Sequence, residues 1–338
     1  VASRGPLLAR LLDPASRPEF EQHPLVGRLR SSLGEQGLLR EGCGIVLSLS
    51  GGVDSMVTCC LLALLRGQLP RGQRFRWCAL HLQHPNRYDA LDEAGWVRWV
   101  CSKLGADLYC YRPQIRRPHG ALRTGISRED YESKSKEIRF RMYSRCLKRL
   151  GVKIGAALVA HHQDDADENR LAELGKGNIL HIDGMGVSST MLGVRVIRPL
   201  LAARKAELVG FAEAANLCYM QDSTPRWSRR GWIRCLLDGL GEKDSPRHAR
   251  LSAALTRAGA LSEALGAELD ESLGGWRQRG IAPRSLALPD AAALVRELSE
   301  AKGNKKPSAP GAEPASGIGV DAKETECAAG DDGALTVG

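Results

Sequence analysis

A polar loop with two adjacent glycines interrupts the apolar sequence near residue 50, and it is the segment best suited to chemistry. Its residues are Ser50, Gly51, Gly52, Val53, Asp54 and Ser55. Adjacent glycines can adopt positive φ and let a ligand approach the backbone closely. If a helix follows, its N-terminal N–H groups favour an anion, and the serine hydroxyls add donors. The loop therefore predicts a phosphate site in which Asp54 holds Mg²⁺ or caps the helix.

The loop differs from the common nucleotide-binding loop G-x-x-x-x-G-K-S/T, because it lacks the lysine and the longer spacing. A plainer interpretation stays open at this point. The same residues also suit a strand-to-helix turn that ends in an Asp or Ser cap and binds nothing.

A second polar group follows the apolar run that ends at Ala160, and its members are His162, Asp164, Asp165 and Glu168. Asp165 and Glu168 are three residues apart, so on a helix they share one face. Carboxylates beside a triphosphate can hold Mg²⁺, or they can bind an incoming ammonium group and take its proton. Two alternatives remain: an acid-rich helix N-terminus without further function, and, less favoured, a zinc site that lacks a third spaced His or Cys.

Alternating apolar segments place both groups at the same edge of a sheet. Strands are expected at Cys43–Leu49, Phe75–Leu82, Ala106–Tyr111 and Ala156–Ala160, and helices at Met56–Leu65, Asp89–Leu104, Ser127–Leu150 and from Asp164. This alternation predicts an α/β fold, a parallel twisted sheet with helices on both faces. Ligands bind at the carboxyl ends of such strands.

The chain is expected to have four parts. An N-terminal helical segment (1–39) precedes the α/β domain (40–240) and a helical extension (241–300). The tail (301–338) is expected to be disordered, since 19 of the 37 residues from 302 onward are Gly, Ala, Ser or Pro and none is aromatic.

Positive charge is concentrated in two segments. The net charge of the chain is +9, and between Arg112 and Lys153 there are thirteen Lys and Arg against four Asp and Glu. Between Arg195 and Arg234 there are eight against three. Clustered positive charge indicates a polyanionic partner, with nucleic acid first, although solvated helix faces would give the same pattern.

Several strings resemble the N-type ATP pyrophosphatases, known as the PP-loop superfamily, and within it the tRNA(Ile)-lysidine synthetases. The first string is SGGVDS at Ser50–Ser55. The others are ESKSKEIRF at Glu132–Phe140, AHHQDDADEN at Ala160–Asn169, RPLL at Arg198–Leu201 and QDSTPRWSRRGWIR at Gln221–Arg234. Together they span about residues 40–240 in the family's order. The chain departs from the family pattern where Pro225 and Gly231 replace Asn and where Gln83 replaces a frequent Asp.

The resemblance implies an adenine nucleotide alpha hydrolase-like, Rossmann-like fold, with ATP and Mg²⁺ as cofactors and tRNA and lysine as partners. The O2 of the anticodon cytosine of tRNA(Ile), anticodon CAU, would attack the α-phosphate, and the lysine amine would then displace AMP to form lysidine. Asp54, Asp164, Asp165 and Glu168 would be catalytic, with Asp54 and Asp165 as metal ligands. His81 would join the loop in binding ATP.

The resemblance also assigns residues to tRNA binding. They are Glu132, Lys136 and Arg139 on the basic helix, with Arg204, Arg230 and Arg234 further along the chain. Basic residues beside Trp227 and Trp232 suit stacking on unpaired bases. Solvated helices with core tryptophans are the plainer interpretation of these two segments.

Three other functions remain open. A tRNA sulfur transferase of the same superfamily is weakened because the chain has no C-x-x-C pair for a cluster or zinc. A catalytically silent binding protein for tRNA or nucleotide would bind RNA without releasing pyrophosphate. A synthetase that forms amides of small molecules would release pyrophosphate without tRNA.

The ten cysteines are predicted to be reduced and mostly buried, which favours an intracellular protein. No apolar run of about 18 residues is present, so no membrane partner is expected. We expect a cytoplasmic protein. Because the first residue is Val1 rather than Met, the alternative is an organellar protein from which a targeting segment has been removed. The sequence does not determine the oligomeric state.

Overall fold

The structure, a computed structural model, describes residues 8–84, 90–115, 126–178, 182, 185–220, 229–239, 245–278 and 336–337. A sheet with the strand order β5-β6-β4-β1-β2-β3-β7 organises most of them. The strands are β1 (Cys43–Ser48), β2 (Arg76–Leu82), β3 (Asp107–Tyr111), β4 (Ile154–Leu158), β5 (Ser188–Met191), β6 (Val194–Ile197) and β7 (Thr336–Val337). β1 pairs in parallel with both β2 and β4, so it lies at the centre.

The sheet is parallel except at its two edges. β2–β3 and β4–β6 are parallel, whereas β5–β6 and β3–β7 are antiparallel. The hairpin of β5 and β6 was not predicted, because its strands have only four residues each and β5 carries few apolar side chains. Leu192 and Gly193 both have positive φ at its turn, as a tight two-residue hairpin requires.

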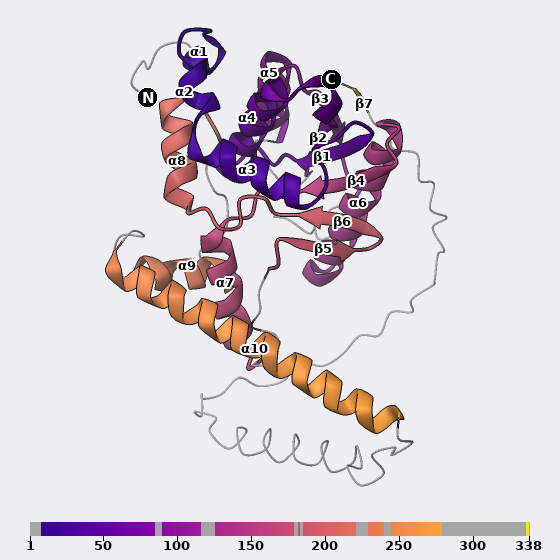
Figure 1. Ribbon diagram of the computed structural model, residues 1–338, viewed down its shortest axis with the longest axis vertical. Coiled ribbons are helices and arrows are strands. Elements are labelled where there is room, and N and C mark those ends of the chain that lie inside the picture. Colours follow the sequence, from indigo (N-terminus) through magenta and orange to yellow (C-terminus); the bar gives the residue numbers. More distant parts are fainter. Residues whose placement is uncertain are drawn as a thin grey trace, which may run out of the picture. The chain divides into compact units, whose positions relative to one another are not determined.

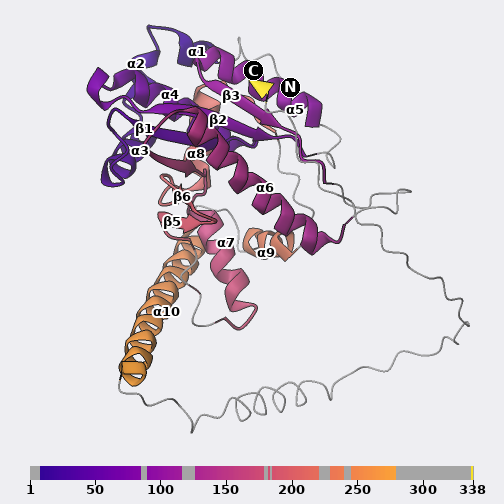
Figure 2. The ribbon, with the colours of Figure 1, turned by 90° about the vertical axis from the view of Figure 1, so that its right-hand side faces the viewer.

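Helices cover both faces of the sheet, which confirms the predicted fold class (Figures 1 and 2). The helices in the described part of the chain are α1 (Ala9–Leu12), α2 (Arg17–Glu21), α3 (Pro24–Glu35), α4 (Val53–Gln68), α5 (Ala90–Leu104), α6 (Arg128–Arg149), α7 (Gln163–Leu174), α8 (Lys205–Ala214), α9 (Arg229–Asp238) and α10 (Pro246–Gln278). Alternate residues of β1 belong to different cores: Ile45 and Leu47 pack with α3, α4, α5 and α8, whereas Val46 packs with α6. Because β1 is covered on both faces, its sequence is a continuous apolar run.

Two strand glycines let the α6 side of the sheet pack closely. A Cβ at Gly44 would lie 2.5 Å from Val152 Cγ2, and one at Gly155 would lie 2.5 Å from Leu147 Cδ2. Both distances are too short for a side chain, so the glycines set how near α6 and its following turn approach the strands.

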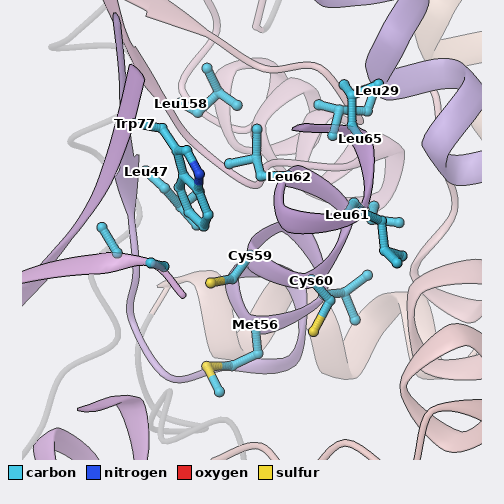
Figure 3. Close-up of a cluster of buried hydrophobic side chains, with 14 of the residues drawn as sticks. Leu29, Leu47, Met56, Cys59, Cys60, Leu61, Leu62, Leu65, Trp77 and Leu158 are labelled. Atoms are coloured by element: carbon cyan, nitrogen blue, oxygen red, sulfur yellow. The ribbon is translucent and has the colours of Figure 1, made fainter. Parts of the chain in front are cut away.

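The larger core is built around α4. Figure 3 shows Cys59 and Cys60 of this helix among Leu61, Leu62 and Leu65. Six of the nine cysteines that the structure describes are buried, and all nine are free thiols. The expectation that most cysteines lie in the core is therefore confirmed for the described part of the chain.

The chain divides into two compact units, one formed by Val1–Glu263 with Gly333–Gly338 and the other by Ala264–Asp332, and α10 crosses the division. The four parts expected from the sequence stay a prediction. Most of the tail lies outside the described residues, and the two described there form β7. In the described ranges, no helix combines the length and apolarity needed to cross a membrane.

Candidate active site

The glycine loop leaves the carboxyl end of β1 and enters α4, as the sequence predicts. Gly51 has φ +84°, a conformation that favours glycine, and Gly52 is the N-terminal cap residue of α4. The buried Ser55 hydroxyl donates to the Gly52 carbonyl at 3.0 Å and accepts the Ser50 N–H at 3.1 Å. Ser55 therefore fixes the shape of the loop, whereas Ser50 is exposed and accessible to a ligand.

Residues of neighbouring segments contact this loop and fix its position. Met220 donates its N–H to the Gly51 carbonyl at 2.9 Å, and a Cβ at Gly51 would lie 3.0 Å from the buried Glu93 side chain. His81 is 1% exposed, and its Nδ1 lies 2.9 Å from the carbonyl oxygen of Leu49. We therefore propose that His81 supports the strand end that carries the loop rather than touching ATP through an open surface.

α7 begins beside the loop, and His162 caps it. The backbone N–H of His162 donates to Asp165 Oδ2 at 3.2 Å, and the Asp165 N–H donates to His162 Nδ1 at 3.4 Å. The same imidazole, 5% exposed, has Nε2 within 3.4 Å of Asp165 and 3.6 Å of Asp54. His162 thus links the acid of the loop to the acids of α7.

The N-terminus of α8 brings two cations to these acids. Lys205 Nζ lies 2.7 Å from both carboxylate oxygens of Asp54, and the Lys205 backbone N–H donates to Asp164 at 2.8 Å. Arg204 Nη1 lies 3.2 Å from Asp167 and 3.9 Å from Asp164. Lys205 was not predicted as a site residue. Its position becomes informative only once the start of α8 is known, because a lysine at the first residue of a helix opposes the helix dipole.

α9 supplies the remaining cations. Arg230 pairs with Asp165 at 2.7 Å and with Glu168 at 2.8 Å, and Arg234 pairs with Glu168 at 2.7 Å. The Glu168 side chain is only 6% exposed, whereas that of Arg230 is 50% exposed. Arg230 and Arg234, expected at a tRNA surface, therefore neutralise the predicted catalytic acids, and Arg230 keeps one side open to solvent.

These contacts keep Asp164 and Asp165 ionised at neutral pH. Burial raises the pKa of Asp164, but hydrogen bonds from His162 and from the Lys205 N–H, with the charge of Arg204, hold that pKa far below its usual range. Burial also raises the pKa of Asp165, and the charges of His162 and Arg230 outweigh it, so this pKa is lowered too. Carboxylates of such low basicity suit holding a positive charge better than accepting a proton.

His161 sits next to this cluster as a neutral imidazole. Burial lowers its pKa to about 4; Asp165 opposes that shift, and the nearby Arg198 and Arg230 reinforce it. The buried Arg198 donates to His161 Nδ1 at 3.2 Å and to the Gly186 carbonyl at 2.9 Å. Arg198, part of the RPLL string, therefore fixes the ring that precedes the cap of α7.

Three of the residues expected to bind tRNA lie on α6, a helix that reaches the end of β1 from which the glycine loop starts. Glu132 and Lys136 are exposed, and Arg139 is half-buried. One turn further, Tyr143 hydrogen-bonds the side chain of Ser48, the last residue of β1. Gln221, Trp227 and the other residues of 221–228 lie outside the described residues, as does the side chain of Arg229.

The site fits magnesium only when substrate supplies most of the ligands. Searched over its described ranges, the chain has no group of three or more His, Cys, Asp or Glu side chains placed to hold a metal. Mg²⁺ usually takes one or two carboxylates together with phosphate oxygens and water. Asp54 of the glycine loop and Asp165 of α7 suit that mode when Mg²⁺ displaces their cationic partners, Lys205 and Arg230.

Comparison with known proteins identifies the domain. Residues 28–237 match the family model of the PP-loop domain, which covers more than half of the chain. The chain belongs to the PP-loop family, whose members use ATP. The matched residues include the loop, α7, α8 and most of α9, so every ion pair described above lies within the PP-loop domain.

The PP-loop chain is also similar to curated tRNA(Ile)-lysidine synthases. It is 30% identical over 232 residues to the tRNA(Ile)-lysidine synthase of Bradyrhizobium diazoefficiens, covering 67% of this chain and 61% of the relative. It is 30% identical over 181 residues to the corresponding synthase of Lactiplantibacillus plantarum, covering 53% of this chain and 37% of the relative. The chain thus spans between about a third and two thirds of the length of these relatives.

A solved structure confirms the fold. The U34-tRNA thiolase of Methanococcus maripaludis, described with its 4Fe-4S cluster, superposes with a TM-score of 0.55 at 19% identity, over 72% of this chain and 80% of that one. At this identity the likeness shows a shared architecture and says nothing of a shared reaction.

Proposed function

We propose that this PP-loop chain is an ATP-dependent tRNA-modifying ligase that forms lysidine. The anticodon cytosine of tRNA(Ile) attacks the α-phosphate of ATP through O2, and pyrophosphate leaves. The lysine ammonium group then releases a proton to solvent, and the free amine forms a bond to C2 while the C2–O2 bond breaks and AMP leaves with that oxygen. Two lines support this proposal: the match to curated tRNA(Ile)-lysidine synthases and the junction of a phosphate loop with ionised acids.

The single observation that carries the proposal is the link from Asp54 through His162 to Asp165. A nucleotide cradle lies on one side of this link, and carboxylates that can hold an ammonium group lie on the other. Adenylation and amine transfer need those two functions within reach of one carbon atom. The geometry therefore supports a reaction with two steps at one centre.

Each residue group has a separate task in this account. Ser50, Gly52 and the N-terminus of α4 hold the phosphates, and bound Mg²⁺ would neutralise charge on the leaving pyrophosphate. Lys205 places a cation at the same point and keeps Asp54 oriented. Asp165 and Glu168 are both paired with Arg230. In the reaction they bind the lysine ammonium group in place of the Arg230 guanidinium.

The tRNA is expected to approach over α6 and the exposed side of Arg230. Lys136 and Arg139 lie on α6, whose Tyr143 touches the end of β1. Phosphate contacts from such residues position an RNA, and the flipped cytosine would then enter between α6 and α7.

Incorporation of labelled lysine into a tRNA(Ile) transcript with anticodon CAU tests the proposal. Label is expected only with ATP and Mg²⁺, and it should disappear when the anticodon C is changed to U. Pyrophosphate release that needs tRNA but leaves no label would retain adenylation and reject lysine as the nucleophile. RNA binding without either signal would favour a silent binding protein, and release without tRNA would favour a small-molecule synthetase.

A further inference from the structure

An open pocket lies against the acids of α7. Its empty space, including the part that is open solvent, is about 390 Å³, and Asp164, Asp167 and Glu168 form one wall. The other wall comes from α9 and the first turns of α10. The α10 residues in this lining are His248, Leu251, Ser252 and Leu255, and all four follow the PP-loop domain match, which ends at residue 237. A segment outside the family domain therefore completes a cavity on the catalytic acids.

His248 is the unusual member of this lining. Its side chain is buried, at 7% exposure, yet neither ring nitrogen has a hydrogen-bond partner among the residues that the structure describes. A buried imidazole without partners is costly, because it has lost its water without replacement. Its backbone is fixed, since the His248 N–H donates to Ser245 Oγ at 3.4 Å at the start of α10. The ring is thus held against the pocket with both hydrogen-bonding atoms unused.

The lining defines the chemistry of a ligand. Carboxylates of α7 with Arg204 and Arg234 make a wall of mixed charge, which suits a group that carries both an ammonium and a carboxylate. Leu237, Leu251 and Leu255 offer an apolar surface for a short aliphatic chain. An imidazole nitrogen adds one neutral hydrogen bond to a polar end. An amino acid with an unbranched aliphatic side chain that ends in a second polar group would match the charged wall, the apolar surface and the imidazole nitrogen.

We infer that this pocket receives the amine co-substrate and that His248 is a specificity-determining residue that hydrogen-bonds one of its polar ends. The inference rests on the proposed function for the identity of lysine, and it adds a residue from α10 to a reaction centre otherwise built by the PP-loop domain. His248 satisfies its own buried nitrogen when the ligand binds. Selection among amino acids then depends on a helix that the family domain does not include.

Binding of L-lysine to the full chain, measured by calorimetry, tests the inference. His248→Phe keeps an aromatic ring but removes both nitrogens, so the Kd for lysine should rise about fivefold to tenfold. His248→Gln can restore one hydrogen bond and should recover part of that loss. Arg250→Ala is the control, because Arg250 is exposed two residues further along α10 and does not line the pocket.

A spectroscopic readout separates contact from a structural effect. With histidine labelled at the ring carbon Cε1, the resonance missing from His248→Gln identifies His248, and saturating lysine should shift it. Norleucine, which lacks the terminal amine, should bind more weakly than lysine in the wild type. An unshifted His248 resonance, or a His248→Phe variant that binds lysine as the wild type does, would overturn the inference.

The test also distinguishes this inference from the proposed function. If the wild type releases no pyrophosphate with ATP and tRNA, the proposed function fails. Lysine binding that still depends on His248 would then support the pocket by itself. If pyrophosphate release depends on tRNA but lysine binds without any contribution from His248, the ligase proposal stands and the role of His248 is wrong.

Discussion

Both carboxylate oxygens of Asp54 lie 2.7 Å from the ammonium nitrogen of Lys205, although 151 residues separate the two in the sequence. This pair ties the first turn of α4, which carries the glycine loop, to the first residue of α8. Asp54 is also within 3.6 Å of His162. A single carboxylate therefore connects three elements, and the loop cannot move without disturbing the acid cluster.

Replacing Lys205 should impair catalysis much more than stability. Both partners are about a quarter to a third exposed, so Lys205→Met should change the free energy of unfolding by less than about 1 kcal/mol. Loss of a cation beside the leaving pyrophosphate should lower kcat about tenfold to hundredfold. Urea unfolding and tRNA-dependent pyrophosphate release measure the two effects. Unchanged turnover would remove Lys205 from the mechanism.

The two loop glycines should respond differently to alanine. Gly51→Ala places a Cβ at φ +84°, 3.0 Å from Glu93, and should destabilise the fold by about 1–3 kcal/mol. Gly52→Ala has ordinary φ and no neighbour nearer than 3.6 Å, so the protein should fold normally. If phosphate approaches Gly52 closely, this second variant should still lose ATP affinity. Normal ATP binding by folded Gly52→Ala would place the phosphates elsewhere.

Glu168 should be a stability residue as well as a site residue. Its buried carboxylate accepts hydrogen bonds from Arg230 and Arg234, so Glu168→Gln removes the negative charge that both guanidinium groups contact, while Asp165 still pairs with Arg230. We expect a loss of about 2–4 kcal/mol in the free energy of unfolding. Glu213→Gln, at an exposed position of α8, is the matched control and should change it by less than about 0.5 kcal/mol. Equal unfolding midpoints for the two variants would contradict the buried ion-pair network.

Stability should fall as the pH is lowered from about 6.5 towards 4. The folded-state pKa of His161 is about 4, below its unfolded value, so the unfolded chain binds a proton first and is favoured across this window. The contribution is on the order of 3 kcal/mol. The lowered pKa values of Asp164 and Asp165 add a further loss only below about pH 4.

His161→Asn tests the origin of that slope. Asparagine can still accept the hydrogen bond from Arg198 but does not titrate, so the free energy of unfolding should vary less between pH 6.5 and 4. The pKa of His23 is also lowered by burial, and this smaller contribution should remain in the variant. Identical slopes for wild type and His161→Asn would show that His161 is not the titrating group.

The sequence predicts the sheet and the two polar groups at its carboxyl edge well, because both depend on local patterns. Continuous apolar runs mark β1 and β4, and the polar segments that follow them, with Ser50 and Asp164, must then share an edge. The edge hairpin β5–β6 carries too short and too mixed a pattern to be recognised.

Pairing between distant side chains could not be predicted in the same way. Arg230 and Arg234 were expected at an RNA surface because of the family resemblance and because basic residues beside tryptophans suit RNA, and neither pattern gives information on which side chains they contact. Lys205 and His248 were missed for a similar reason. Each depends on how a helix packs against α7, and residue spacing within the helix does not encode that contact.

The most direct test of the central claim is the cleavage of ATP by the wild type and by Asp54→Asn in the presence of the CAU transcript. The account predicts AMP and pyrophosphate, formed only with a transcript that carries the anticodon C, and a loss of at least about a hundredfold in Asp54→Asn. Formation of ADP and phosphate, or equal pyrophosphate release by both proteins, would contradict it.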